Sequence, residues 1–422
     1  MLFEVIRYFA YGWIGEYWIE PPFLFGYYGF SWVHPWPGIG MYLHMALLGL
    51  FAIFIAFGFA YRVSAILLFL GFTFCFLLEQ AIYLNHFYLV CLLSFLLIFV
   101  PANRALAIDA WLHPQSRTNS VPAWTVWLFR GQMGIVYFYS GLAKISADWL
   151  RGEPMRMWLA GRADLPIVGR FVHDQWPVYL ISYGGMLLDL LIAPLLLWRR
   201  TRAVAFCLAL GFHLTNAWLF FIGIFPWVAI AATALFLSPD WPRRLLASVT
   251  QNPISPGRIT KVAGTPQNKT FVLVLIAIYF TIQLLIPLRH WLIPGNVAWT
   301  YEGHLFSWRM KLLNRDARAR FFVTDPNNGV TREVDPLNYL RPAQAEKMAA
   351  RPDMILQFAH FLARREPRSG ARPLQVRAEV LLALNGREAA PLVDPKVDLA
   401  AEQPTLGHAN WILPMPESTS SR

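Results

Sequence analysis

The chain has 422 residues, of which 56% are hydrophobic, 16% aromatic and only 14% charged. A soluble domain carries roughly a quarter charged residues, so this composition excludes an ordinary soluble protein and indicates that most of the chain faces lipid or lies in a large apolar core. The net charge of +11 does not indicate a nucleic-acid partner, because the arginines lie beside apolar segments instead of forming one basic face.

The N-terminal segment, residues 1–41, is aromatic and contains several Pro and Gly residues. Its first stretch, "MLFEVIRYFAYGWIGEYWIE", lacks the basic start and the small-residue cleavage site of a signal peptide, so we expect an amphipathic or partly inserted helix. Residues 20–40, "EPPFLFGYYGFSWVHPWPGIG", predict a surface or re-entrant segment that does not span the membrane.

Eight apolar runs follow, and each is long enough to cross a bilayer core of about 30 Å as a helix. Their predicted boundaries are 42–60, 64–80, 83–100, 123–141, 176–197, 203–221, 222–238 and 271–291. They predict a mainly α fold, a polytopic bundle of about eight transmembrane helices over residues 42–291. The three cysteines, Cys75, Cys91 and Cys207, lie inside these runs without a CxxC pair, and we interpret them as small core residues.

The last part of the chain, residues 292–422, holds much of the charge and alternates apolar with polar residues. Asn327-Asn328-Gly329 and Asn385-Gly386 are good hairpin turns. Residues 343–365, between them, have helical periodicity. We therefore expect a small extramembrane α+β domain, followed by a disordered tail in "PMPESTSSR".

The arginines orient the bundle across the membrane. If 42–60 is the first crossing, four arginine-bearing connections fall on one side, and the positive-inside rule assigns that side to the cytoplasm. The first contains Arg62, the second Arg104 and Arg117, the third Arg199, Arg200 and Arg202, and the fourth Arg243 and Arg244. Lys144 and the C-terminal domain then lie together on the opposite, periplasmic or luminal side.

We expect each polar side chain at membrane depth to have a hydrogen-bond partner or a function, because burial without partners costs several kcal/mol. Lys144, in "YFYSGLAKISADWLRG", is either a snorkelling anchor or a base where water is scarce. His86 follows Asn85 at the start of an apolar run, and it is either a hydrogen-bonded interface histidine or a functional one.

Three further polar residues lie deeper in the apolar runs. His213 and Asn216 share one helical face, and they could belong either to a structural hydrogen-bond network or to a catalytic one. For Asp189, in the middle of its run, we favour a partner in helix packing.

Several classes of enzyme have no support in this sequence. HExxH, a recognisable zinc pair, a P-loop and GxSxG are all absent, which argues against a metal site, an ATPase and a serine hydrolase. What remains is a lysine, two histidines and two asparagines among many aromatic residues. A lysine is a base at neutral pH only when burial lowers its pKa, and an apolar aromatic pocket at the membrane edge can do this. Such a pocket also suits a lipid-soluble substrate.

The sequence resembles the vitamin K-dependent γ-glutamyl carboxylase family, as a bacterial-type homologue with an HTTM-like membrane domain. The resemblance covers about residues 40 to 400 and rests on seven stretches in order. They are "YRVSAILLFLGFTFCFLL", "NHFYLVCLLSFLLIFVPANRALAIDA", "RGQMGIVYFYSGLAKISADWLRG", "FHLTNAWLFFIGIF", "SPDWPRR", "WTYEGHLFSWRMKL" and "NGREAAPLVDPKVDLA". It implies γ-carboxylation of protein glutamate coupled to 2,3-epoxidation of vitamin K hydroquinone, with O2 and CO2 and without a metal.

The resemblance also implies roles for individual residues. It makes Lys144 the base that starts the oxygenation, with His86 of the Asn85-His86 pair in support. The matching C-terminal stretches imply that Arg387 lies near the glutamate carboxylate, which suits the bidentate grip of a guanidinium. The residues implied in handling glutamate and quinone are Trp299, His304, Trp308 and Met310, and we add His213 and Asn216 to the substrate-binding set.

Three departures from the animal enzymes leave other functions open. Those enzymes have two adjacent lysines where this chain has Ala143-Lys144, a tyrosine in place of His304, and a longer C-terminal extension. The expected partners are membrane lipid, a quinone and a glutamate-containing peptide or protein. One alternative function is a quinol oxygenase that forms the epoxide without carboxylating protein. Another is a quinone-binding membrane protein without catalysis, against which the retention of Lys144 and His86 argues.

Overall fold

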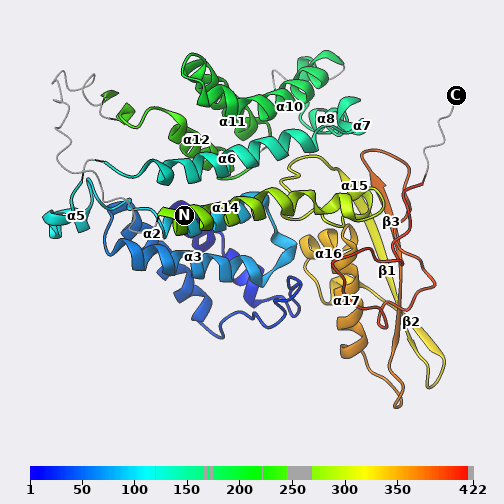
Figure 1. Cartoon of the computed structure of the whole chain (residues 1–422). Coiled ribbons are helices and arrows are strands. Elements are labelled where there is room, and N and C mark those ends of the chain that lie inside the picture. Colours follow the sequence, from blue (N-terminus) through cyan, green and yellow to red (C-terminus); the bar gives the residue numbers. More distant parts are fainter. Residues whose placement is uncertain are drawn as a thin grey trace.

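The computed structural model describes residues 1–118, 120–165, 169–171, 174–220, 222–242, 244–245 and 269–416. A bundle of long helices carries a small α+β domain at one end (Figure 1), so the predicted fold class is confirmed. Arg243 and the tail from residue 417 lie outside the described residues, and the predictions made for them stay predictions.

The predicted spans correspond in order to helices of the bundle. These are α2 (Gly40–Phe57), α3 (Tyr61–Leu78), α4 (Asn85–Leu97), α6 (Ala123–Ala143), α10 (Trp176–Leu197), α11 (Arg202–Phe220), α12 (Phe225–Thr233) and α14 (Lys269–Leu285). Among the described residues, α2, α3, α10, α11 and α14 with its 3-10 extension (Ile286–Leu292) are long and apolar enough to cross a membrane. Helices α4 and α12 are apolar but shorter, and α6 has 21 residues but carries Arg130 and Gln132. The number of eight crossings therefore stays a prediction.

Shorter elements connect these helices. Ahead of α2 lie α1 (Leu2–Ala10) and a π-helical turn (Gly15–Ile19), followed by irregular chain. The connections contain η2 (Gln80–Ile82), α5 (Ile108–Leu112), η3 (Pro114–Ser116), α7 (Ala147–Leu150), α8 (Met155–Ala160) and η4 (Ala234–Phe236). Helices α7 and α8 lie at the same end of the bundle as the α+β domain, whereas α5 lies at the other end (Figure 1). Lys144, which directly follows α6, is therefore at the domain end.

The burial of the cysteines differs in part from the prediction. Cys75 and Cys91 are buried between helices, as expected for small core residues, but Cys207 is exposed. Cys207 lies on α11, whose apolar outer face is left uncovered and suits contact with lipid. An apolar run does not tell which of its residues point inward, so the prediction was wrong for Cys207.

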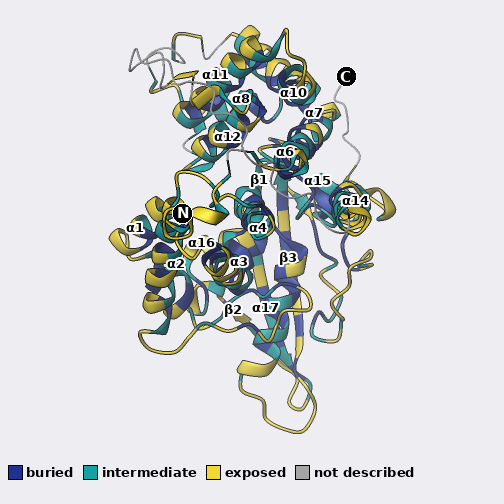
Figure 2. Ribbon diagram, turned by 60° about the vertical axis from the view of Figure 1, so that its left-hand side comes forward, coloured by how far each residue is buried: buried dark blue, intermediate teal, exposed yellow. Residues whose placement is uncertain are grey.

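The C-terminal domain is an antiparallel sheet covered on one face by two helices. The strands are β1 (Arg315–Asp325), β2 (Val330–Val334), β3 (Gln375–Leu384) and β4 (Ala390–Pro391), in the order β2-β1-β3-β4. Both predicted turns connect antiparallel neighbours, and Asn385 and Gly386 have the positive φ values that such turns require. Residues of β3 alternate between buried and exposed (Figure 2), because successive side chains of a strand point to opposite faces.

The helical stretch expected at 343–365 is two helices. They are α16 (Pro342–Ala349) and α17 (Pro352–Arg365). The break falls at Arg351, whose backbone is extended because Pro352 follows it and disfavours a helical conformation there. Helix α17 buries Ile355, Phe358 and Leu362 against the sheet. A short helix, α15 (Val297–Thr300), and the 3-10 turn η6 (Pro336–Asn338) complete the domain.

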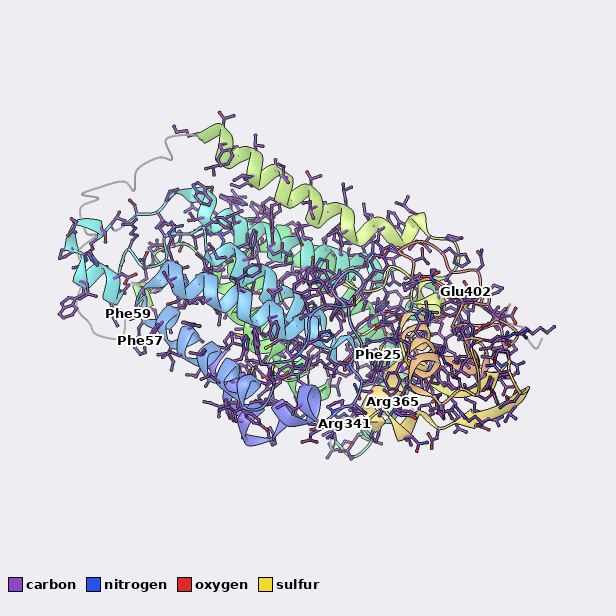
Figure 3. All side chains as sticks on the ribbon, turned by 90° about the horizontal axis from the view of Figure 1, so that it is seen from below. Phe25, Phe57, Phe59, Arg341, Arg365 and Glu402 are labelled. Carbon is purple, nitrogen blue, oxygen red and sulfur yellow. The ribbon has the colours of Figure 1, made fainter. Side chains whose placement is uncertain are left out.

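The bundle and the domain meet at a buried carboxylate, Glu79, directly after α3. It accepts hydrogen bonds from the backbone N–H groups of Phe25 (3.3 Å) and Ala81 (2.8 Å) and from Nε2 of Gln344 in α16 (2.7 Å). Phe25 lies at this junction, whereas Phe57 and Phe59 lie at the far end of the bundle (Figure 3). Burial is the main cause that raises the pKa of Glu79 to about 7. The junction is therefore most stable when this carboxyl group is protonated.

Replacing Glu79 by glutamine should remove a dependence of stability on pH. The pKa of the carboxyl group is raised from 4.5 to about 7 in the folded protein, so the wild type loses stability relative to Glu79→Gln as the pH rises through this window. The full loss is about 3 kcal/mol. Thermal unfolding in detergent at pH 5 and pH 7.5 measures it, with Glu346→Gln at an exposed position as the control. A stability difference between wild type and Glu79→Gln that is equal at both pH values would contradict this account.

Candidate functional site

Lys144 lies in a buried ion pair at the domain end of the bundle. Its Nζ is 2.6 Å from Oδ2 of Asp189 on α10 and 2.8 Å from Oγ of Ser140, which itself donates to Asp189 over 2.7 Å. The side chains of Lys144 and Asp189 are only 7% and 5% exposed. A snorkelling lysine would extend its head group into water, so this geometry argues against the anchor and makes the lysine part of an internal network.

The sequence of α6 and α10 brings the two charges together. Ser140 and Lys144 are four residues apart and therefore share one helix face. Gly141, between them, allows α10 to approach closely, since a Cβ atom there would lie 2.8 Å from the backbone nitrogen of Leu190. The indole of Trp149 lies 5.5 Å below the lysine ammonium group and donates a hydrogen bond to the carbonyl of Ser182. The lysine is thus held from α6, α7 and α10.

A second polar network is centred on Tyr137, which lies about one helical turn before Ser140 on the same face of α6. Tyr137 is hydrogen-bonded to Nε2 of His213 (2.7 Å) and to Thr233 on α12 (2.8 Å). Because the Thr233 hydroxyl donates to the carbonyl of Ala229, Tyr137 donates to Thr233 and accepts from His213. This order leaves Nδ1 of His213 as the unprotonated nitrogen, buried and without a partner. The Asp189 carboxylate is near enough to interact electrostatically with both Tyr137 and His213.

His86 and Asn216 are not joined to the lysine by contacts among the described residues. The ring of His86 lies 4.9 Å from Phe87 and 5.6 Å from Phe225, and Phe225 in turn lies 6.2 Å from the ring of His213. The ring of Phe225 therefore connects His86 to the Tyr137–His213 network, and no hydrogen bond among the described residues joins His86 to Lys144. Asn216 is half-buried, one turn after His213 on α11.

A loop from the C-terminal domain, residues 301–311, inserts into the bundle beside α6. Trp308 is fully buried and stacks on Tyr88 of α4 with ring centroids 5.0 Å apart, and its Nε1 has no hydrogen-bond partner. Met310 packs against the same apolar cluster, which includes Tyr137. Asn85 helps to hold the loop, since it donates to the carbonyl of Arg309 over 3.4 Å.

The backbone of this loop is strained. Four residues that are not glycine have positive φ values, a conformation that costs of order 1–3 kcal/mol each and clusters at functional sites. They are Tyr301, Phe306, Trp308 and Lys311. Strain of this kind persists only where surrounding contacts fix the chain, and the hydrogen bond from the Phe306 backbone to the Tyr83 hydroxyl (2.8 Å) is one of them.

A cluster of cationic side chains lies at the base of the loop. His304 is buried and stacks on Tyr301 at 4.2 Å, and Arg315 and Arg351 lie 5.2 and 5.3 Å from the same tyrosine ring. Burial is the main cause that lowers the pKa of His304 well below its ordinary value, so this imidazole is neutral. Burial also lowers the pKa of Arg309 to about 10, which still leaves a cation at neutral pH.

Three donor or acceptor atoms of this cationic cluster are buried without a partner. They are Nδ1 of His304, Nε of Arg309 and Nη2 of Arg315. Within the part of the chain that the structure describes, no carboxylate forms an ion pair with Arg309, Arg315 or Arg351. Unpaired buried donors with positive charge are a suitable environment for an anion.

Trp299 and Arg387 are both engaged by the protein itself. The indole of Trp299 lies in the domain core and donates to the carbonyl of Leu413 over 2.9 Å. Arg387 grips the carboxylate of Asp148 in α7 with two hydrogen bonds of 2.8 and 2.5 Å, and Asn385 adds a third of 2.8 Å. The guanidinium group holds the pKa of Asp148 below its usual range. Arg387 therefore ties the domain to the segment that carries Lys144.

Sequence reasoning missed three members of the site. Asp189 does lie where α10 packs against α6, as the sequence suggests, but the sequence does not show that its partner is Lys144. Ser140 and Tyr137 were not singled out, although their spacing from Lys144 along α6 places all three on one face. The spacing alone could have indicated a shared face. That this face takes part in polar contacts is seen only from its partners on other helices, Asp189, His213 and Thr233. No cluster of metal-binding side chains occurs among the described residues.

Two protein-family models match the chain, and together they cover most of it. Residues 1–241 match the HTTM domain, and residues 268–418 match the lumenal domain of vitamin K-dependent gamma-carboxylase. The first match covers the bundle as far as η4, and the second covers α14 and the whole C-terminal domain. No solved structure matches the chain.

The contact between Asp148 and Arg387 should stabilise the docking of the domain cooperatively. Asp148→Ala and Arg387→Ala should each lower stability, and the double variant should lose less than the sum, with a coupling of about 1–2 kcal/mol. Thermal unfolding of the four proteins measures this coupling. The control is the equally bidentate pair of Arg320 with Glu333, which is about half exposed and should couple by less than about 1 kcal/mol. Additive effects of the Asp148 and Arg387 substitutions would contradict the assignment.

Proposed function

The chain belongs to the vitamin K-dependent γ-carboxylase family, and on that premise we propose that it carboxylates protein glutamate with vitamin K hydroquinone, O2 and CO2. When bound, the hydroquinone reacts with O2 to supply the strong base that takes a γ-proton from glutamate, CO2 adds to the carbanion, and the quinone leaves as the 2,3-epoxide. The observation that carries the proposal is the buried pair of Lys144 with Asp189 at the end of the bundle where the lumenal domain docks.

Lys144 is proposed as the group that accepts the hydroxyl proton of the quinol. An ammonium group cannot accept a proton, so the amine has to be freed first. Proton transfer from Nζ to Oδ2 of Asp189 along their 2.6 Å hydrogen bond frees it without creating net charge in the apolar interior. The amine then takes the quinol proton and becomes an ammonium group beside the neutral acid. Ser140, hydrogen-bonded to both groups, keeps them aligned during the exchange.

The residues around Tyr137, seven residues before Lys144 on the same face of α6, suit a quinol ring. Such a ring needs aromatic surfaces and hydrogen-bonding groups for two oxygen atoms. The stacked pair of Trp308 and Tyr88 supplies the first, and the unpartnered Nε1 of Trp308 supplies a donor. The free Nδ1 of His213 supplies an acceptor for a quinol hydroxyl group. Met310 and Phe225 add apolar surface, and His86 contributes through its contact with Phe225.

The glutamate carboxylate is proposed to bind at the cationic cluster of the lumenal domain. Arg309 and Arg315 offer buried, unpaired N–H groups, and a neutral His304 beside them can accept or donate a hydrogen bond. Arg387 remains a candidate for binding the glutamate carboxylate. The substrate would then have to displace the Asp148 carboxylate from the two guanidinium nitrogens of Arg387. Trp299 supports this region from the domain core, and Asn216 adds a polar side chain on α11.

The proposed location is a multi-pass membrane protein with the lumenal domain outside the cytoplasm. Helix α10 runs antiparallel to α6, because Leu190 lies against Gly141 whereas Ala193 lies against Gly134. The connection that follows α10, with Arg199 and Arg200, therefore lies toward the end of the bundle opposite the domain. The positive-inside rule favours that end for the cytoplasm. The proposed partners are membrane lipid, a quinone and a glutamate-containing peptide or protein.

Lys144→Arg should abolish both products of the reaction while the protein stays folded. Arginine keeps the charge that Asp189 needs but does not give up its proton, so it cannot serve as a base. Purified protein in detergent is incubated with vitamin K hydroquinone, a glutamate peptide and labelled bicarbonate, and epoxide and fixed carbon are followed separately. Both rates should fall by about 10²-fold or more. The control is Lys347→Arg at an exposed position on α16, which should leave both rates unchanged.

Two results of this assay would change the proposal. Wild-type rates in a Lys144→Arg variant with normal thermal unfolding would refute the role of the lysine. Epoxide formation by the wild type without any fixed carbon would identify a quinol oxygenase instead of a carboxylase. Lys144→Met is a poorer probe, because it leaves Asp189 buried without a partner and should cost about 3–5 kcal/mol of stability.

A further inference from the structure

The connection between α4 and α6 carries an apolar surface at the end of the bundle opposite the lumenal domain, where α5 lies (Figure 1). In the part of the chain that the structure describes, four apolar side chains in and beside α5 are exposed. They are Leu106, Ile108, Trp111 and Leu112, and the most exposed are Leu106 and Trp111, at 95% and 78%. We call these four residues the α5 surface.

Helix α5 turns its polar side toward the protein and its apolar side outward. Asp109 accepts hydrogen bonds from the backbone N–H groups of Ala60 (2.8 Å) and Tyr61 (3.0 Å) at the start of α3, and from Nδ2 of Asn103 (2.7 Å). Ala110 beside it is buried. The residues of α5 that belong to the α5 surface lie three and four positions from the first of them, so they share the opposite face. A surface helix in water has the reverse arrangement, which indicates that this face contacts an apolar partner.

Contacts with the turn between α2 and α3 fix the chain around Leu106. Ala107 packs so closely against Gly58, in that turn, that a Cβ atom on Gly58 would clash with it. The N–H group of Asp109 donates to the carbonyl of the same glycine over 3.0 Å. Leu106 itself has a φ of 52°, a left-handed conformation that is strained for a leucine. A strained backbone that holds a leucine almost entirely outside the protein favours an apolar partner for its side chain.

The α5 surface adjoins the exposed apolar sides of the first two long helices. Phe57 and Phe59, on either side of Gly58, are 61% and 37% exposed, and they lie at the end of the bundle far from the lumenal domain (Figure 3). Helices α2 and α3, which this turn connects, are both long and apolar enough to cross a membrane. Leucine and tryptophan side chains at the ends of such helices are typical of the boundary between acyl chains and head groups. The apolar partner that best fits this position is therefore the membrane.

Three arginines accompany the apolar side chains. Arg62 and Arg104 each donate a hydrogen bond to a backbone carbonyl, and Arg117 is exposed. Among the described residues, no carboxylate forms an ion pair with any of the three. The acidic residue of this connection, Asp109, is already taken up by backbone N–H groups. Cations beside an apolar face attract the negatively charged head groups of anionic lipids.

We propose that the α5 surface inserts into the membrane at this end of the bundle and binds anionic phospholipid. Its apolar side chains lie among the acyl chains, and Arg62, Arg104 and Arg117 contact the phosphate groups. The proposal is independent of the proposed function, because it concerns the opposite end of the bundle and involves no reacting group. Residues 246–268, which lie outside the described residues, are a poor alternative partner by charge, since they contain two basic residues and no acidic one.

Spin labels at single cysteines test the insertion. Cys207→Ser removes the exposed cysteine, and the other two cysteines are buried. Trp111→Cys in this background carries the label, and the protein is reconstituted in vesicles of phosphatidylcholine and phosphatidylglycerol. Oxygen, which concentrates in lipid, should collide with this label more often than a nickel chelate does, because the chelate stays in water. Leu70→Cys, 56% exposed on α3, should behave in the same way, and Leu406→Cys, 73% exposed in the lumenal domain, should show the reverse.

A lipid titration tests the role of the arginines. Phosphatidylglycerol added to the protein in detergent should raise the temperature of thermal unfolding more than phosphatidylcholine does. In the double variant Arg104→Gln, Arg117→Gln, the phosphatidylglycerol concentration that gives half of this stabilisation should rise about fivefold for each cation removed, the contribution of one cation near an anionic surface. Arg364→Gln, Arg365→Gln, exposed in the lumenal domain, is the matched control and should behave like the wild type. If the first pair does not fold, Arg62→Gln replaces Arg104→Gln.

Several outcomes would overturn the proposal. A label at residue 111 that behaves like the label at residue 406 would refute the insertion. A label that neither oxygen nor the nickel chelate reaches would show that protein covers the α5 surface, either another part of this chain or a second protein. Equal stabilisation by both lipids, or an unchanged titration of the arginine variant, would refute the binding of anionic head groups. Inorganic phosphate that stabilises the protein as well as phosphatidylglycerol does would identify a site for the free ion instead of a lipid.

Discussion

The site depends on keeping one positive charge inside an apolar helical bundle. Lys144 and Asp189 are both almost fully buried, and neither would be tolerable there alone. Their contact requires α6 and α10 to approach at Gly141, because any side chain at that position would meet the backbone of α10. A buried ion pair is weak evidence for stability, since well-packed apolar residues often serve as well. Its presence at the end of the bundle that meets the lumenal domain is what the proposed proton transfer requires.

The lumenal domain contributes side chains to the proposed site. Its strained loop delivers Trp308 and Met310 into the bundle beside the network of Tyr137, and its Arg387 holds Asp148, four residues beyond the lysine. The buried carboxylate of Glu79 fixes the same domain from the other side, through Gln344. These contacts come from different parts of the chain, so the two regions matched by separate family models pack together, as the proposed function requires.

Local sequence patterns predicted the elements of this protein better than its contacts. The apolar runs gave the helices, and Asn385-Gly386 gave a turn, because length, hydropathy and backbone preference are properties of short segments. The helical periodicity over 343–365 is confirmed, and Pro352 divides this stretch into α16 and α17. Family resemblance drew attention to Lys144, Trp308 and Arg387 by their motifs.

The partners of these residues could not be read in the same way. Asp189 is 45 residues from Lys144, and Asp148 is 239 residues from Arg387. These two acids become the partners of Lys144 and Arg387 only because α6 packs against α10 and the domain packs against α7. The support of Lys144 by His86 also depends on spatial arrangement and stays a prediction; among the described contacts, the ring of His86 faces Phe225.

The most direct test of this account is an electron cryo-microscopy structure of the protein with a bound, unreactive hydroquinone analogue. An oxygen atom of the analogue should lie within about 2.6–3.2 Å of Nζ of Lys144, or be connected to it by one water molecule. The ring should lie between α6 and Trp308. An analogue whose ring lies away from Lys144, with the contact between Lys144 and Asp189 intact and closed to the ligand, would contradict the central claim that this pair receives the proton of the quinol.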